Sequence, residues 1–135
     1  MAKVTGLGTT TCTVDNVAGV AKAISNDILS IEVSNPRGVF DVTGVDKSAI
    51  ERILGLSDGV LTLKGAFNSA ADKSHDIFAP VTSSNVARTV AILFPGATWT
   101  AEIAFSEYAV TRGADGSLQW TATGSLATGV APAWS

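Results

Sequence analysis

The chain has 135 residues, a net charge of −3 at pH 7 and only 16% charged side chains, which suits a single domain spanning residues 1–135. The acidic balance argues against a protein that grips nucleic-acid phosphates, and a single cysteine, Cys12, excludes an internal disulfide and a cysteine-only metal site. No apolar run is long enough to span a membrane, and the first residues lack the apolar core of a signal peptide, so we expect a protein made in a cytoplasm that does not enter a membrane. So few charges leave the surface weakly defended against association, which indicates contact with other protein.

The N-terminal third predicts an arm followed by strands. Residues 1–10 are rich in glycine and threonine and are typical of an arm rather than a packed element. Segments dominated by β-branched and small apolar residues then predict strands over 9–14, 17–24 and 28–33. The turn signal NPRG at 35–38 leads from the last of these into 39–43, because proline presets φ and glycine tolerates positive φ. We therefore expect a hairpin of 28–33 with 39–43.

One helix is expected, over residues 46–55. Asp46 is a suitable N-cap, since its carboxylate can accept an unpaired backbone N–H. Ile50, Ile53 and Leu54 fall at positions i, i+3 and i+4 and form one apolar stripe. Gly55 stands where a left-handed residue usually ends a helix. A helix of two to three turns is too short to hold alone, so we expect it to lie on a sheet.

A long loop is expected over residues 68–85, after a buried strand at 60–67. The loop shows no sustained hydrophobic period, and so long an irregular segment inside a compact domain is often functional. We expect its own packing not to fix it, so that in a free subunit it is mobile and neighbouring subunits order it, as they do the arm. The candidate inter-subunit residues are Asp72, Lys73, His75, Asp76 and Phe78.

Three further strands complete the predicted fold. They run over 86–94, 98–110 and 117–126, whereas the tail at 129–135 is too rich in small residues to predict another element. Seven or eight strands with one short helix indicate a mainly β fold, an antiparallel β-sandwich or barrel-like domain flanked by that helix.

The last two strands carry the clearest pattern. Alternation places Trp99, Ile103 and Phe105 on one face of the first strand, and Trp120 and Leu126 on the matching face of the second. That apolar face is expected to be buried. The opposite face is rich in hydroxyl groups and comprises Thr100, Glu102, Ala104, Ser106 and Tyr108 on the first strand and Gln119, Thr121, Thr123 and Ser125 on the second.

No catalytic, metal or cofactor site is indicated. The single histidine, His75, stands among Asp72, Lys73 and Asp76, but groups so close in sequence do not converge on one point unless the loop wraps around them. Cys12 is flanked by threonines in a strand and is typical of a small buried hydrophobe rather than a reactive thiol. We therefore expect neither enzyme activity nor a cofactor.

Several phrases resemble the major tail proteins of long-tailed bacteriophages, which polymerise into the tail tube. They are VTRGADGSLQW at 110–120, GVAPAW at 129–134, GVLTLKG at 59–65 and VARTV at 86–90. The expected helix at 46–55, between strands, fits the same layout. The resemblance covers most of residues 15–135.

This resemblance implies a structural virion protein. Hexameric rings would stack into a tube around a tape measure protein, bounded by tail terminator and tip proteins, after assembly in the host cytoplasm. DNA would pass through without specific binding, since hydroxyl groups hold water and offer phosphates no cations. The candidate lumen-facing residues are Thr100, Glu102, Ser106, Gln119, Thr121, Thr123 and Ser125.

Two alternatives remain open at this stage. A monomeric carbohydrate-binding β-sandwich would expose Trp99, Trp120 and Trp134 as a stacking platform. A small hydrolase or isomerase would need His75 in a pocket.

Overall fold

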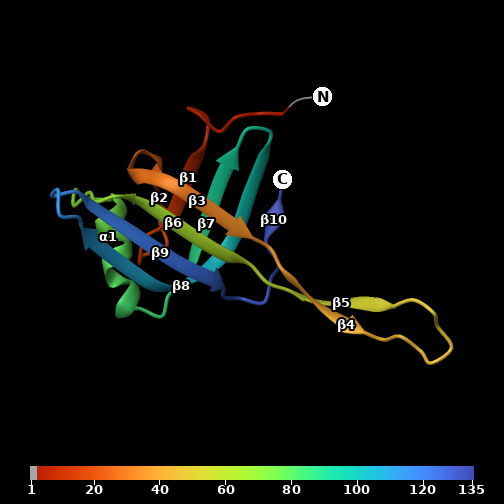
Figure 1. Ribbon diagram of the computed structural model, residues 1–135. Coiled ribbons are helices and arrows are strands. Elements are labelled where there is room, and N and C mark those ends of the chain that lie inside the picture. The colour runs from red at the N-terminus through yellow and green to blue at the C-terminus, as the bar shows by residue number, and fades with distance from the viewer. Residues whose placement is uncertain (1–2) are drawn as a thin grey trace.

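The computed structural model describes residues 3–135 as a mainly antiparallel β fold with one short α-helix, as expected from the sequence (Figure 1). The strands are β1 Thr11–Asp15, β2 Ala21–Ala23, β3 Ile28–Ser34, β4 Arg37–Asp41, β5 Arg52–Ser57, β6 Val60–Ala66, β7 Arg88–Phe94, β8 Ala97–Arg112, β9 Leu118–Leu126 and β10 Ala133–Trp134. The helical elements are the 3₁₀ turn η1 Ser25–Asp27, the helix α1 Ser74–Phe78 and the 3₁₀ turn η2 Ala79–Thr82.

Eight strands form one sheet that curls around a single core. Its order is β2-β1-β7-β8-β9-β6-β3, with β10 paired to β8. The strands β1, β7, β8, β9, β6 and β3 all turn their apolar faces to the same interior. Trp99 of β8 and Trp120 of β9 are the largest buried side chains there. Ile77 and Phe78 of α1 complete the core. Figure 1 shows α1 at the end of the sheet away from the β4–β5 hairpin.

The helix expected over 46–55 is wrong. These residues form the tip of a hairpin and the first part of β5, which pairs with β4. The stripe of Ile50, Ile53 and Leu54 has no sheet beneath it, and all three side chains are exposed. A short helix without packing does not repay its nucleation, whereas β4 and β5 prolong two strands, β3 and β6, that are already paired.

The hairpin expected between 28–33 and 39–43 is also wrong. β3 pairs with β6, and β4 pairs with β5, so the turn at 35–38 carries the chain from one antiparallel ladder into the next rather than reversing it. The true reversal lies between β4 and β5, at the far tip in Figure 1.

Two shorter segments differ from the sequence expectations as well. The tail does form an element, because β10 pairs with β8 at Ala133 and Trp134. Within the segment 17–24, only Ala21–Ala23 is a strand. The residues that precede this strand form a turn, because the backbone N–H groups of Ala18 and Val20 donate to the side-chain oxygen of Asn16. Among the described residues, no helix is long and apolar enough to cross a bilayer.

Candidate assembly surfaces

The structure gathers the hydroxyl-rich strand residues on one face of the sheet, away from the core. In the register of β9 with β6, Thr121 and Thr123 lie opposite Lys64 and Thr62, while Trp120 and Ala122 point inward. Thr100 and Glu102 of β8 take the same side, because they alternate with the buried Trp99, Ala101 and Ile103. We call this surface the polar face; its members among the candidates are Thr100, Glu102, Gln119, Thr121, Thr123 and Ser125.

A bulge in β8 changes which later side chains belong to the polar face. The register with β9 shifts between Phe105 and Glu107, so Glu107 pairs with Thr123 on the polar face. Tyr108 moves to the core side and stacks on Phe78, with ring centroids 5.8 Å apart. The expectation that Tyr108 shares the hydroxyl-rich face is therefore wrong. Ser106 occupies the bulge itself, where its hydroxyl donates to the carbonyl of Thr123 at 3.4 Å.

Strands β6 and β3 widen the polar face beyond the residues found from the sequence. Thr62 and Lys64 of β6 continue it, and Glu32 of β3 pairs with Thr62. The period-two pattern of Val60, Thr62 and Lys64 could have revealed this extension. Over β3, β6, β9 and β8 the polar face carries one cation, Lys64, against the carboxylates Glu32, Glu102 and Glu107. Its charge is therefore negative.

The middle of the segment 68–85 forms α1 and packs into the core of its own subunit. The mobility of the rest of the segment in a free subunit stays a prediction. Ser74, Ile77 and Phe78 are buried, and the backbone N–H of Ser74 donates to the buried carboxylate of Asp27 at 3.1 Å. Asn68 donates to the same carboxylate at 3.0 Å. Phe78 is fully enclosed in the core, so its assignment as an inter-subunit residue is wrong.

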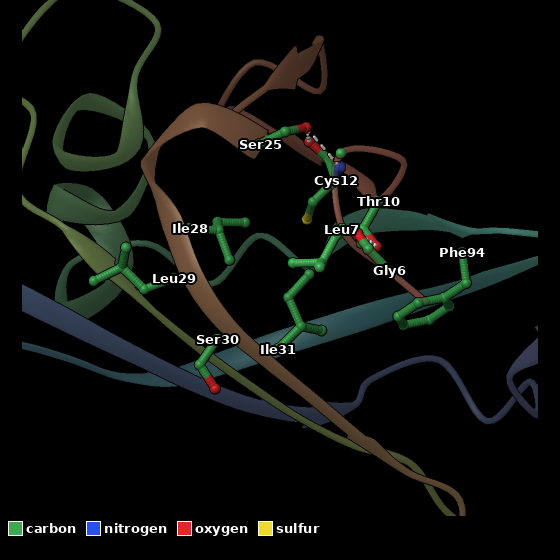
Figure 2. Close-up of a pocket in the computed structure, with 11 residues that line it drawn as sticks. Gly6, Leu7, Thr10, Cys12, Ser25, Ile28, Leu29, Ser30, Ile31 and Phe94 are labelled. Atoms are coloured by element: carbon green, nitrogen blue, oxygen red, sulfur yellow. Dashed lines mark hydrogen bonds between the residues drawn. The ribbon is translucent and has the colours of Figure 1, made fainter. Parts of the chain in front are cut away.

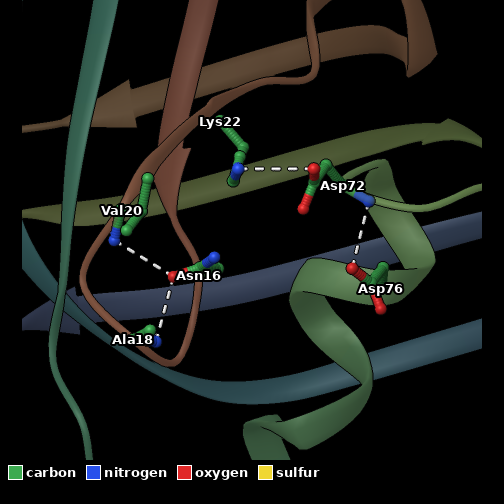
Figure 3. Close-up of polar contacts among 6 residues, drawn as sticks. All are labelled: Asn16, Ala18, Val20, Lys22, Asp72 and Asp76. Carbon is green, nitrogen blue, oxygen red and sulfur yellow. Dashed lines mark hydrogen bonds and ion pairs between the residues drawn. The ribbon is translucent and has the colours of Figure 1, made fainter.

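The other loop candidates stand at or near the surface. Asp72 forms an ion pair with Lys22 of β2 at 3.3 Å, and its backbone N–H donates to Asp76 at 3.0 Å (Figure 3). Lys73 is half-buried. His75 is half-buried between Phe67 and Tyr108, and its Nδ1 lies 3.1 Å from the Tyr108 hydroxyl. Burial raises the pKa of Tyr108.

The tryptophans do not form a common stacking platform. Trp99 and Trp120 are buried, and their indole N–H groups donate to Asn35 at 3.0 Å and to the Ala66 carbonyl at 2.8 Å. Only Trp134 is exposed, beside Phe94. The carbohydrate-binding alternative thus loses the surface it requires.

The residues capable of chemistry are dispersed. Within residues 3–135, no three of the histidine, cysteine, aspartate and glutamate side chains converge as a metal site would need. Cys12 is buried, and burial raises the pKa of its thiol to about 12. That thiol is protonated at neutral pH and unreactive.

The β4–β5 hairpin exposes several large apolar side chains. Phe40 pairs with Ile53 on one face, and Val39 pairs with Leu54 on the other. The exposed fractions of Phe40 and Leu54 are 58% and 59%, and that of Leu56 is 90%. Apolar side chains on both faces of a projecting hairpin need a partner, since an isolated two-stranded ribbon is marginal in water.

A groove of about 540 Å³ lies away from the hairpin, between the N-terminal arm, β1, β3 and the end of β7. Figure 2 shows Leu7, Cys12 and Ile31 turned toward the same space. The groove is lined by Gly6, Leu7, Gly8, Thr10, Cys12, Ser25, Ile28, Leu29, Ser30, Ile31 and Phe94, none of which carries a charge.

Comparison with known proteins gives similarity in structure alone. No protein-family model matches this sequence, and no curated protein is detectably similar to it. A chain from the tail of an empty gene transfer agent particle, refined with C6 symmetry, is similar with a TM-score of 0.79 and 14% identity, over 98% of this chain and 99% of that chain.

Two further solved structures agree. A chain from the virion of a native gene transfer agent particle has a TM-score of 0.73 and 12% identity, over 92% of this chain and 95% of that one. A chain from the anti-feeding prophage baseplate, 6-fold symmetrised, has a TM-score of 0.67 and 12% identity, over 100% of this chain and 97% of that one. This chain thus shares its fold with chains of a gene transfer agent tail, a gene transfer agent virion and a prophage baseplate, in agreement with the mainly β fold that the sequence resemblance implied.

Proposed function

We propose that this chain is a structural subunit of a phage-type tail tube, in which hexameric rings of identical copies stack within the virion. The fold shared with chains of a C6-symmetric tail supports this proposal. The exposed apolar hairpin is the observation that carries it, because a polymerising subunit needs a surface that is stable only when another copy covers it.

The hairpin has no apolar surface of its own domain to rest on. Its strands β4 and β5 pair only with each other among the described strands, and Figure 1 shows them projecting away from the curled sheet. Burying one large apolar side chain contributes about 1.5–3 kcal/mol. Contact of Phe40, Leu54 and Leu56 with a neighbour would therefore stabilise an assembly substantially.

A second copy is the partner that fits a tail tube. We propose that the hairpin contacts a different surface of the next copy, since such head-to-tail contacts generate rings or stacked filaments. We assign the half-buried Lys73 and His75 and the exposed Asp72 and Asp76 to contacts between subunits.

The polar face is proposed to line the channel. The candidates on this face are Thr100, Glu102, Gln119, Thr121, Thr123 and Ser125, to which the sheet adds Thr62, Lys64 and Glu107; Ser106, in the adjoining bulge of β8, is a further candidate. Hydroxyl groups and a carboxylate excess hold water without retaining phosphates, so DNA passes without specific binding. The tape measure, terminator and tip proteins are the further proposed partners, and no catalysis is required of the chain.

Electron microscopy and sedimentation of the purified chain test this proposal. The unmodified protein is expected to form rings or tubes with six-fold symmetry. Leu54→Asp combined with Leu56→Asp is expected to remain folded and to stay monomeric, because the carboxylates cannot be buried against a neighbour. Ala114→Asp, in the exposed β8–β9 turn, adds a carboxylate elsewhere and is expected to assemble. A chain that stays monomeric at high concentration in every salt condition contradicts the proposal.

A further inference from the structure

We propose that the groove between the N-terminal arm and β3 receives strand β5 from the hairpin of a second copy. This inference rests on the proposed assembly function, and it adds to that function the acceptor surface on the neighbouring subunit.

The groove is chemically suited to an apolar strand. Its lining contains no charged residue, and Leu7, Ile31 and Phe94 provide apolar walls. Leu7 and Leu29 are largely exposed in the isolated chain, so the groove is open to solvent. The groove has a volume of about 540 Å³, which is room for several side chains of a partner strand rather than for one.

Strand β3 supplies an unpaired edge along this groove. β3 is the last strand of the sheet and pairs on one side only, with β6. Alternate backbone N–H and C=O groups of an edge strand point away from the sheet and can hydrogen-bond to an added strand. A strand laid here would gain main-chain hydrogen bonds and bury side chains in the groove at the same time.

Strand β5 matches that site in its sequence. Between Arg52 and Ser57 the chain reads ILGL, four residues without charge. Leu54 lies on one face of β5, beside Val39, and Ile53 lies on the other, beside Phe40, while Leu56 is exposed in the irregular part of the ladder that follows Leu54. One face can therefore enter the groove while the other contacts a further surface, which accounts for apolar side chains on both faces.

A copy cannot fill its own groove. The groove lies beside Ile28–Ile31 at the start of β3, whereas the hairpin begins beyond Ser34 at its other end, about 10–20 Å further along the strand. Figure 1 shows the hairpin directed away from the arm. The contact must therefore join two copies head to tail, as in rings or stacks.

Cross-linking between two cysteine variants tests the inference. Ser30→Cys places a thiol in the groove and Ser57→Cys places one at the end of β5; both changes are nearly isosteric and both sites are exposed. Subunits of the two variants are mixed, assembled and treated with a short bismaleimide. The native Cys12 stays unreactive because it is buried with a pKa of about 12. About tenfold more cross-linked dimer is expected in the mixture than in either variant alone, since docking raises the effective concentration of the thiols.

The matched control pairs Ser57→Cys with Thr123→Cys on the polar face, and little cross-linking is expected. Tubes that form normally but link Ser57→Cys to Thr123→Cys, or to neither site, overturn the groove assignment and leave the proposed function intact. An unmodified chain that forms no polymer contradicts the proposed function, and the groove assignment with it. A second measurement is independent of thiols: Leu29→Asp is expected to abolish tube formation while the monomer keeps its thermal stability, and normal tubes from this variant contradict the inference.

Discussion

The backbone carbonyl of Asp27 occupies the space that a side chain at position 65 would need, because a Cβ on Gly65 would lie 1.9 Å from that oxygen. This close approach lets η1 press against β6, and the register of β3 with β6 is interrupted at the same place, between Ile28 and Ser30. Because Gly65 has no side chain, Asp27 can lie against β6, where its carboxylate accepts hydrogen bonds from Asn68 and from the N–H of Ser74 at the start of α1.

Gly65→Ala is therefore expected to cost several kcal/mol, at the upper end of single substitutions, because backbone rather than a movable side chain must give way. Chemical denaturation monitored by circular dichroism measures the loss. Gly38→Ala is the matched control: its nearest neighbour would be 3.8 Å away, so stability should be nearly unchanged. Equal stability of the two variants contradicts the close approach.

Asp27→Ala is expected to lower the free energy of unfolding by about 1–3 kcal/mol, because it leaves the N–H of Ser74 and the amide of Asn68 without their acceptor. Hydrogen exchange should show faster opening of α1 before the rest of the sheet. Asp46→Ala, at an exposed site in the hairpin tip, should change stability by less than about 0.5 kcal/mol. Unchanged protection of α1 in Asp27→Ala argues against this anchor.

Arg88 is buried and donates from Nη1 to the carbonyl of Ile77 near the end of α1. Burial lowers the pKa of this guanidinium, and the charge of Asp15 opposes that effect. Arg88→Ala is expected to destabilise the fold by about 2–4 kcal/mol through lost packing and an unpaired carbonyl. Arg88→Met keeps most of the packing and should lose less in the same denaturation experiment. A methionine variant as unstable as the alanine variant would show that packing contributes little.

Replacing Thr121 and Thr123 with arginine is expected to leave folding and tube assembly intact while slowing DNA passage, because each cation invites a phosphate contact. The measurement is the rate of DNA release from assembled particles. Thr121→Gln with Thr123→Gln adds bulk without charge and should release DNA at close to the normal rate. An assembled tube with these side chains on its outer wall refutes the lumen assignment.

Cys12 is expected to resist maleimide in the native chain at pH 8 and to react once the chain is unfolded. The reason is its burial, which raises its pKa to about 12 and leaves almost no thiolate. Mass spectrometry with and without denaturant measures the labelled fraction. Rapid labelling of the folded protein would mean that the groove floor opens readily.

The sequence alone determined the features that depend on local alternation. The period-two pattern of residues 98–110 and 117–126 predicted that Trp99 and Trp120 are buried and that Thr121 and Thr123 lie on the opposite face, and both are confirmed. Side chains alternate across any strand, so these faces follow from the chain itself.

Tertiary structure decided what alternation cannot encode. Ile50, Ile53 and Leu54 have helical spacing, but their conformation depends on β3 and β6 being paired where the hairpin begins, a contact distant in sequence. The bulge beside Ser106, which turns Tyr108 inward, depends on the fit of β8 to β9. Phe78 lies in a segment without periodicity, and it is buried because the curled sheet leaves an open end that α1 and η2 cover. Local spacing fixes the face of a side chain, whereas its partner is chosen by the packing of the whole chain.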